Sequence, residues 1–238
     1  MKTHAKALSA AAAAVVALST ALPAQAMLVL QGPEDFEGTG LGSVNTILTL
    51  ESPANTTVEE GSVARMVGSA TDVISGDAKT GASQTQTRSI EELGITSASD
   101  IRVVFNALEP GNGANSVSLD DLVLTIFSPT GTELFSTGAF SPIDFADTFT
   151  GAGNSGFVFA LDAAQAAAAQ AAAFAGDFGA NLFGLSASVS DATGGFETFF
   201  VASAGVTPPI PEPQTYALML AGLGAVGFMA FRRRRPEI

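Results

Sequence analysis

Short runs of alternating apolar and polar residues recur along the middle of the chain. Such alternation is typical of strands with one buried face. It is clearest at 182–189, where Leu185, Ala187 and Val189 alternate with serines. A proline- and glycine-containing turn at 128–131 separates two such runs and suits a hairpin. We predict strands at 44–51, 62–67, 84–88, 101–108, 119–127, 132–137, 157–161, 182–189 and 196–202.

One segment predicts a helix instead. Ten alanines lie between Ala163 and Ala175, and alanine has the highest helix propensity. Asp162 is a suitable N-cap, Gln165 stands at the capping-box position, and Gly176 ends the segment. Because its side chains are small, we expect this helix to lie close to a sheet as a thin lid over one end. Docking of a partner is an open alternative. A shorter helical turn is predicted at 89–94.

Many short strands with one substantial helix indicate a mainly β protein, an antiparallel β-sandwich of jelly-roll type. We assign residues 27–205 to a single domain, which is long enough for one core. Its first part, 28–42, is rich in glycine and acidic residues and is expected to be loop-like. Strand order cannot be read from the sequence, and no internal repeat is seen.

The amino-terminal end has the pattern of a secretory signal peptide. Residues 1–26 contain Lys2 and Lys6 near their start, continue with an alanine-rich apolar stretch and finish with Ala24-Gln25-Ala26. This small-residue ending predicts cleavage after Ala26. The segment is therefore excluded from the fold.

The carboxyl end has the pattern of a membrane anchor. A proline-rich linker at 206–214 leads into an uncharged apolar segment at 215–231, which as a helix is roughly 25 Å long and spans a thin bilayer. The basic tail at 232–238 starts with Arg232, Arg233, Arg234 and Arg235. Such a cluster stays cytoplasmic, so the domain is expected on the opposite side of the membrane.

The order of these features carries a resemblance. Pro211-Glu212-Pro213, then an apolar helix, then a terminal arginine cluster is similar to a PEP-CTERM sorting signal. The resemblance covers only the last thirty or so residues. It implies secretion in a Gram-negative bacterium, processing by an exosortase-type enzyme, a transient stay in the inner membrane, and commonly a setting of exopolysaccharide. An uncleaved tail anchor is the alternative.

The exported region is strongly acidic. Residues 27–210 contain 21 acidic residues against four basic ones, a formal net charge of −17. Nucleic acid is excluded as a partner, since phosphate contacts need a basic surface. The charge suits a solvated, mutually repelling surface. Because the chain has no cysteine, the fold is held by packing and not by disulfides.

The residue types exclude several chemistries. His4, the only histidine, leaves with the signal peptide, so catalysis through His or Cys and zinc sites built from them are unavailable. Carboxylate catalysis and a Ser-Lys pair remain. We predict that the protein is not an enzyme and has no catalytic residue. The carboxylates that a hydrolase would draw on, by residue type alone, are Asp120, Asp121, Asp144, Asp147 and Glu197.

Calcium is an open but weak prediction for the cofactor, because no Asp-x-Asp-x-Asp-Gly loop is present. Adjacent strand residues point to opposite faces, so we place the Asp120–Asp121 pair in a solvated turn. The chain has no Trp, which disfavours an aromatic sugar-binding face, and the phenylalanines of the domain are expected in its core. The candidate calcium ligands are Glu34, Asp35, Glu37, Asp120 and Asp121.

The leading hypothesis is therefore a secreted, non-enzymatic protein with a structural or adhesive role in the cell envelope or an exopolysaccharide matrix, as in a biofilm. A polysaccharide-binding module, with or without calcium, is the alternative. A carboxylate hydrolase is the remote third.

Overall fold

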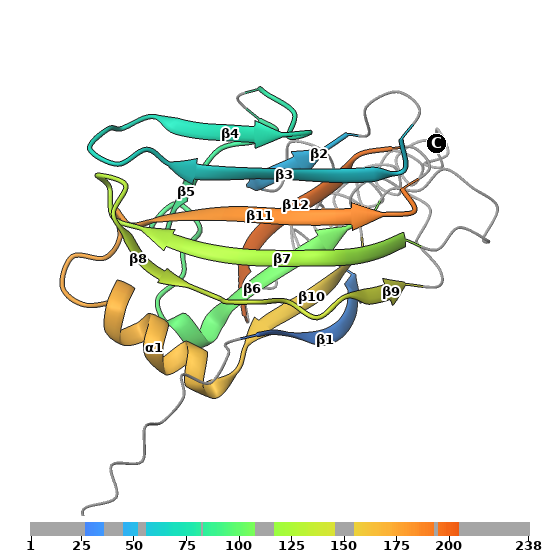
Figure 1. Ribbon diagram of the computed structural model, residues 1–238. Helices are drawn as coiled ribbons and strands as arrows, with labels where there is room; N and C mark the ends of the chain where they lie inside the picture. The colour runs from blue at the N-terminus through green and yellow to red at the C-terminus, as the bar shows by residue number, and fades with distance from the viewer. Residues whose placement is uncertain are drawn as a thin grey trace, which may run out of the picture.

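The computed structural model describes residues 27–35, 45–51, 56–81, 83–107, 117–145, 155–192 and 195–204. In these residues two antiparallel sheets pack face to face, and an α-helix lies at one end of them (Figure 1). The predicted class, a mainly β antiparallel sandwich with an alanine-rich helix, is confirmed.

The first sheet has five strands in the order β1-β10-β6-β12-β2. Every neighbouring pair in it is antiparallel. Its strands are β1 (Leu28–Asp35), β2 (Thr46–Leu50), β6 (Ile101–Asn106), β10 (Ser155–Leu161) and β12 (Glu197–Ser203).

The second sheet has seven strands, with the order β4-β3-β11-β7-β8 and with β5 and β9 paired to β11 and β7. Its strands are β3 (Val58–Arg65), β4 (Asp72–Gly76), β5 (Arg88–Ser89), β7 (Val117–Phe127), β8 (Glu133–Ser136), β9 (Ile143–Phe145) and β11 (Leu182–Ser190).

Strand pairing follows a nested order. β7 pairs with β8, β6 with β10, β3 with β11 and β2 with β12, so the chain forms one long double ribbon. The two sheets arise because this ribbon folds over on itself, which is the order of a jelly roll. The tight turn at its inner end is the predicted one, where the Gly131 N–H donates to the Ser128 carbonyl at 2.9 Å.

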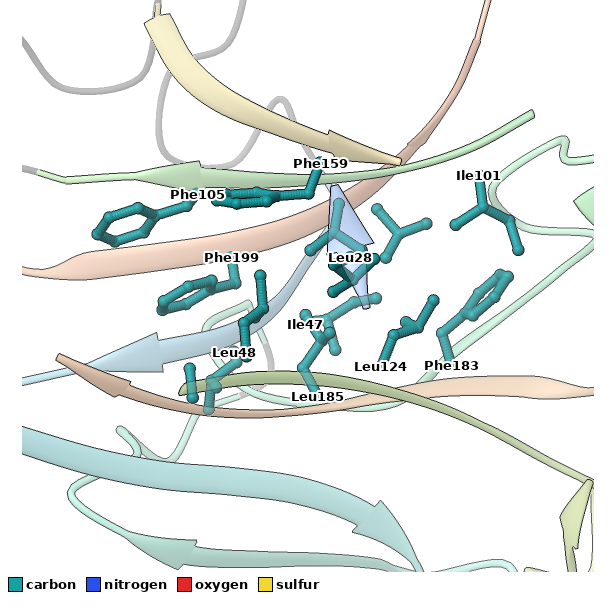
Figure 2. Close-up of a cluster of buried hydrophobic side chains, with 14 of the residues drawn as sticks. Leu28, Ile47, Leu48, Ile101, Phe105, Leu124, Phe159, Phe183, Leu185 and Phe199 are labelled. Carbon is teal, nitrogen blue, oxygen red and sulfur yellow. The ribbon is translucent and has the colours of Figure 1, made fainter. Parts of the chain in front are cut away.

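Aromatic and aliphatic side chains from both sheets fill the space between the layers (Figure 2). The Phe105 ring stacks on that of Phe199, with centroids 4.8 Å apart, and both side chains are fully buried. The prediction that phenylalanine supplies the core is confirmed for most of the described rings. The buried ones are Phe105, Phe127, Phe135, Phe145, Phe159, Phe174, Phe183, Phe199 and Phe200.

The helix α1 (Ala163–Ala173) forms as predicted, with Asp162 and Gln165 bonded reciprocally in a capping box. Ala169 and Ala173 face the core, and the small alanine side chains let the helix approach closely. Gln170 accepts a hydrogen bond from the Ala98 N–H at 2.9 Å, which joins α1 to the short 3-10 helix η1 (Ala98–Asp100). The helix therefore covers one end of the sandwich (Figure 1).

Four parts of the structure differ from the predictions. Residues 28–35, expected to be loop-like, form the edge strand β1, which a bulge between Leu30 and Gly32 makes irregular. The strand predicted at 84–88 is reduced to Arg88 and the residue after it, because the preceding residues bond to β2. The strands β4 and β9 were not predicted.

The border of the five-stranded sheet at β2 is closed by residues 77–87. The Lys79 and Gln86 N–H groups donate to carbonyl oxygens of β2 at 2.9 and 3.0 Å. Thr85 accepts a hydrogen bond from the Thr49 N–H through its hydroxyl at 3.2 Å. As a result all five residues of β2 are buried, although β2 is the last strand of its sheet.

Candidate functional site

The predicted targeting residues lie outside the described part of the chain. These are the signal-cleavage residues Ala24 and Ala26, the sorting residues Pro211, Glu212 and Pro213, and the arginines from Arg232 to Arg235. Within the described residues, no helix has the length and apolar character needed to cross a bilayer.

The pair Asp120–Asp121 lies in β7, not in a turn as predicted. The register between β7 and β11 shifts by one residue there, so that Leu119 pairs with Val189 and Asp121 with Ser188. The extra residue in such a bulge interrupts the alternation of faces. Both aspartates are partly exposed, whereas Leu119 and Leu122 on either side are buried. The two carboxylates therefore share the outer face of the seven-stranded sheet.

The other calcium candidates lie on a different strand. Glu34 and Asp35 end β1, at the border of the five-stranded sheet, while Glu37 lies outside the described residues. Among the residues that the structure describes, no three acidic, histidine or cysteine side chains gather in a group that could hold a metal ion. Calcium binding stays an untested prediction.

The described hydrolase candidates are divided between the two sheets. Asp144 in β9 pairs with Ser118 of β7 and accepts a hydrogen bond from its hydroxyl at 2.7 Å. Glu197 belongs to β12 of the other sheet and is fully buried. Asp147 lies outside the described residues. Glu197 therefore lies apart from the three described aspartates, which belong to the seven-stranded sheet.

Two buried carboxyl groups are a feature that the sequence reasoning missed. Glu59 and Glu197 are both fully buried, and neither lacks an interaction partner. Glu59 shares the inner face of β3 with Gly61 and Val63, which are also buried. The alternation of β3 could have revealed it, since residues two apart on a strand share a face. The predicted strand, 62–67, begins three residues after Glu59.

A polar hollow lies on the outer face of the seven-stranded sheet. It measures about 390 Å³, and its lining comes from β3, the end of β4 and β11. The Ser62 and Ser75 hydroxyls are hydrogen-bonded to each other at 2.7 Å. Asp77 accepts a hydrogen bond from the Glu60 N–H at 3.1 Å. Together with Ser186, these residues give the hollow hydroxyls and carboxylates and no cation.

The four basic residues of the exported region all make contacts within it. Arg65 bonds to Asp72 at 2.9 Å, and Arg88 pairs with Glu92. Arg102 donates to the carbonyl oxygens of Ser99 and Ile101. The fourth, Lys79, binds Glu51 at 2.6 Å and lies over the Phe196 ring, 3.9 Å from its centroid. Each of the four basic side chains is therefore already bonded inside the region, and the region keeps its excess of negative charge.

These features define an acidic jelly-roll sandwich that ends a few residues before a proline-rich, apolar and basic tail. The family model of the PEP-CTERM protein-sorting motif matches residues 209–235. The chain thus carries a PEP-CTERM sorting signal at its carboxyl end, which indicates export and membrane anchoring for sorting. The matched residues do not include the sandwich. No curated protein and no solved structure matches the chain.

Proposed function

We propose that this chain is an exported, non-enzymatic protein that has a structural or adhesive role in the cell envelope or an exopolysaccharide matrix. An exosortase-type enzyme processes it at or near Pro211-Glu212-Pro213 and frees it from the inner membrane. The observation that carries the proposal is that the sorting motif begins just beyond β12, the last described strand of the sandwich, which is paired through Ser203.

The end of the folded part supports release without damage to the fold. Ser203, the last residue of β12, pairs with Ile101, and the Ala204 N–H donates to the Asp100 carbonyl at 2.7 Å. The matched segment starts at residue 209, so processing near the motif removes no strand of the sandwich. A domain freed in this way keeps its complete core.

Both ends of the sandwich's chain lie near α1. Leu28 of β1 pairs with Leu161, directly before the helix, and Ser203 pairs with Ile101, directly after η1. While the anchor is attached, the α1 end is therefore the end nearer to the membrane. The opposite end of the sandwich, where β7 begins and β11 ends (Figure 1), is then the end farther from the membrane.

Mass and location of the protein test this proposal. Three forms are compared in an exporting host: native, a form with Pro211, Glu212 and Pro213 replaced by alanines, and a control with Thr207 and Pro208 replaced. We expect the native and control proteins outside the inner membrane with a mass that lacks the segment after the motif. The triple-alanine form should stay in the membrane at the higher mass. Retention of Arg232–Arg235 in all three forms would overturn the proposal.

A second candidate function is polysaccharide binding, and the hollow at Glu60, Ser62, Ser75, Asp77 and Ser186 favours it. Hydroxyl and carboxylate groups are hydrogen-bonding partners for sugar hydroxyls. Co-sedimentation of the exported protein with exopolysaccharide of the host, with and without chelator, measures binding. Asp77→Asn should weaken it, whereas the exposed control Glu133→Gln on β8 should not. Equal binding by both variants would remove the hollow from consideration.

A further inference from the structure

The strand β4 is the last strand of its sheet, and no described strand pairs with its outer border, which we call the open border (Figure 1). The Asp77 N–H donates to the Glu60 carbonyl at 2.7 Å, and the Met66 N–H donates to the Thr71 carbonyl at 2.9 Å. In an antiparallel pair these bonds alternate, so the backbone groups of residues 72 and 74 point away from β3. No hydrogen bond joins those groups to any residue that the structure describes.

The other borders of the two sheets are protected. Residues 77–87 cover β2, and β1 carries the bulge at Gly32 followed by Pro33. At the far border of the seven-stranded sheet, β8 and β9 are strands of only four and three residues. Covering segments, bulges, prolines and short strands are the means by which proteins prevent edge pairing. The five residues of β4 contain no proline, no lysine and no bulge.

Exposed aliphatic side chains gather beside this border. Met66 is 46% exposed, Val67 78% and Val73 41%, and all three lie on the β3–β4 hairpin. In the described part of the chain only two other large hydrophobic side chains are exposed to this degree, Val29 and Val58. An open strand with apolar neighbours is a template for pairing with another strand.

We propose that a second copy of this chain pairs with the open border, β4 against β4 in antiparallel orientation about a two-fold axis. With full overlap, Ile74 faces Ile74 of the second copy, Asp72 faces Gly76, and Val73 faces Ser75. No two like charges stand opposite each other, and Asp72 is already bonded to Arg65 and to Thr87. A two-fold pairing of this kind closes on itself and yields a dimer.

The net charge sets the strength of the pairing. Each exported region carries a formal charge of −17, so two copies repel each other at low ionic strength. Salt screens this repulsion while the strand pairing itself remains. Association is therefore weak in dilute buffer and becomes stronger as salt is added. The pairing concerns the sandwich alone and is independent of where the protein is finally located.

Sedimentation velocity on the exported chain tests the proposal, in detergent where the anchor is still attached. Measurements at about 20 mM and about 500 mM salt change the Debye length from roughly 20 Å to roughly 4 Å. We expect the dimer fraction to rise with salt. Val73→Glu should raise the dimer dissociation constant by about tenfold or more, because a charge on an edge strand opposes pairing.

Val58→Glu is the matched control. Val58 is an exposed valine on the same outer face, but it belongs to β3, where it pairs with Ser190 of β11 beyond the part of β3 that pairs with β4. Its substitution should leave the dissociation constant within about twofold, since it adds the same charge away from the border. Equal effects of the two variants, or a monomer at both salt concentrations, would overturn the proposal.

The register has its own test, which is clean because the natural chain has no cysteine. Val73→Cys and Ser75→Cys proteins are oxidised separately and as a mixture, and disulfide-linked dimers are counted on a non-reducing gel. Full overlap predicts that the mixture cross-links several times more than either variant alone. Cross-linking that is the same in all three samples, or absent from all three, contradicts the register.

Discussion

The borders at β2 and β4 lie on the same side of the sandwich (Figure 1), but only the border at β2 is covered by another described segment. Residues 77–81 and 83–87 follow β4, bond along β2 and bury it, while no described segment covers the outward backbone groups of β4. The covering segment is held to both strands, since the Thr87 N–H and hydroxyl also bond to Asp72. One segment thus closes one sheet and leaves the other available for contact.

The largest effect is expected from the core that both borders share. Phe105→Ala removes a fully buried ring that stacks on Phe199, and such changes cost about 3–5 kcal/mol in free energy of unfolding. Urea unfolding of the exported protein measures the loss. Amide exchange at Thr49 and Ala64 should accelerate together, because the two borders rest on one core. Exchange that accelerates at one border alone would show that they unfold separately.

The next effect concerns the open border. Gly76 has a positive φ of 68°, and a Cβ there would overlap the Glu60 carbonyl oxygen. Gly76→Ala should therefore cost about 2–4 kcal/mol and detach the end of β4. Gly68→Ala is the control, since its φ is 74° but nothing lies within 4 Å of the added carbon. It should cost only about 1–2 kcal/mol. Equal losses in urea unfolding would mean that the overlap is relieved without strain.

The sequence predicted most of the elements whose signals are local. The alternation in β11, the capping box at Asp162 and the turn at Ser128–Gly131 each depend on neighbouring residues, and each was confirmed. The strand β1 was missed because Gly32 and Pro33 break its pattern. The strand β4 was missed because it is short and its ends are polar, so that only its pairing with β3 defines it.

The candidate sites also differ in whether neighbouring residues alone reveal them. The sorting motif is a contiguous stretch, so residues 209–235 were recognisable without any structure. The hollow combines residues near 61, 76 and 186, which only the strand order brings together. The shared face of Asp120 and Asp121 depends on a bulge in the pairing with β11, and its mark in the sequence is two consecutive acidic residues between the buried Leu119 and Leu122.

A smaller effect tests the closure of β2. Thr85 is buried, and its hydroxyl accepts a hydrogen bond from the Thr49 N–H at 3.2 Å. Thr85→Val keeps the side-chain shape but leaves that N–H without its acceptor, at a cost of about 1–3 kcal/mol. Thr71→Val, at an exposed position before β4, should change the free energy of unfolding by less than about 0.5 kcal/mol. A loss at Thr85 no greater than at Thr71 would show that the hydroxyl is not needed for closure.

The smallest effect concerns the start of the closed border. Arg88 donates to the Thr46 carbonyl of β2 at 3.3 Å and is held in place by an ion pair with Glu92, four residues later. Because the Glu92 side chain is 39% exposed, Glu92→Gln should cost only about 0.3–0.5 kcal/mol. The difference should shrink at high salt, which screens an exposed pair. Urea unfolding at low and high salt measures it. A loss well above 1 kcal/mol that salt does not reduce would mean that Glu92 closes β2 through the position of Arg88 and not through charge alone.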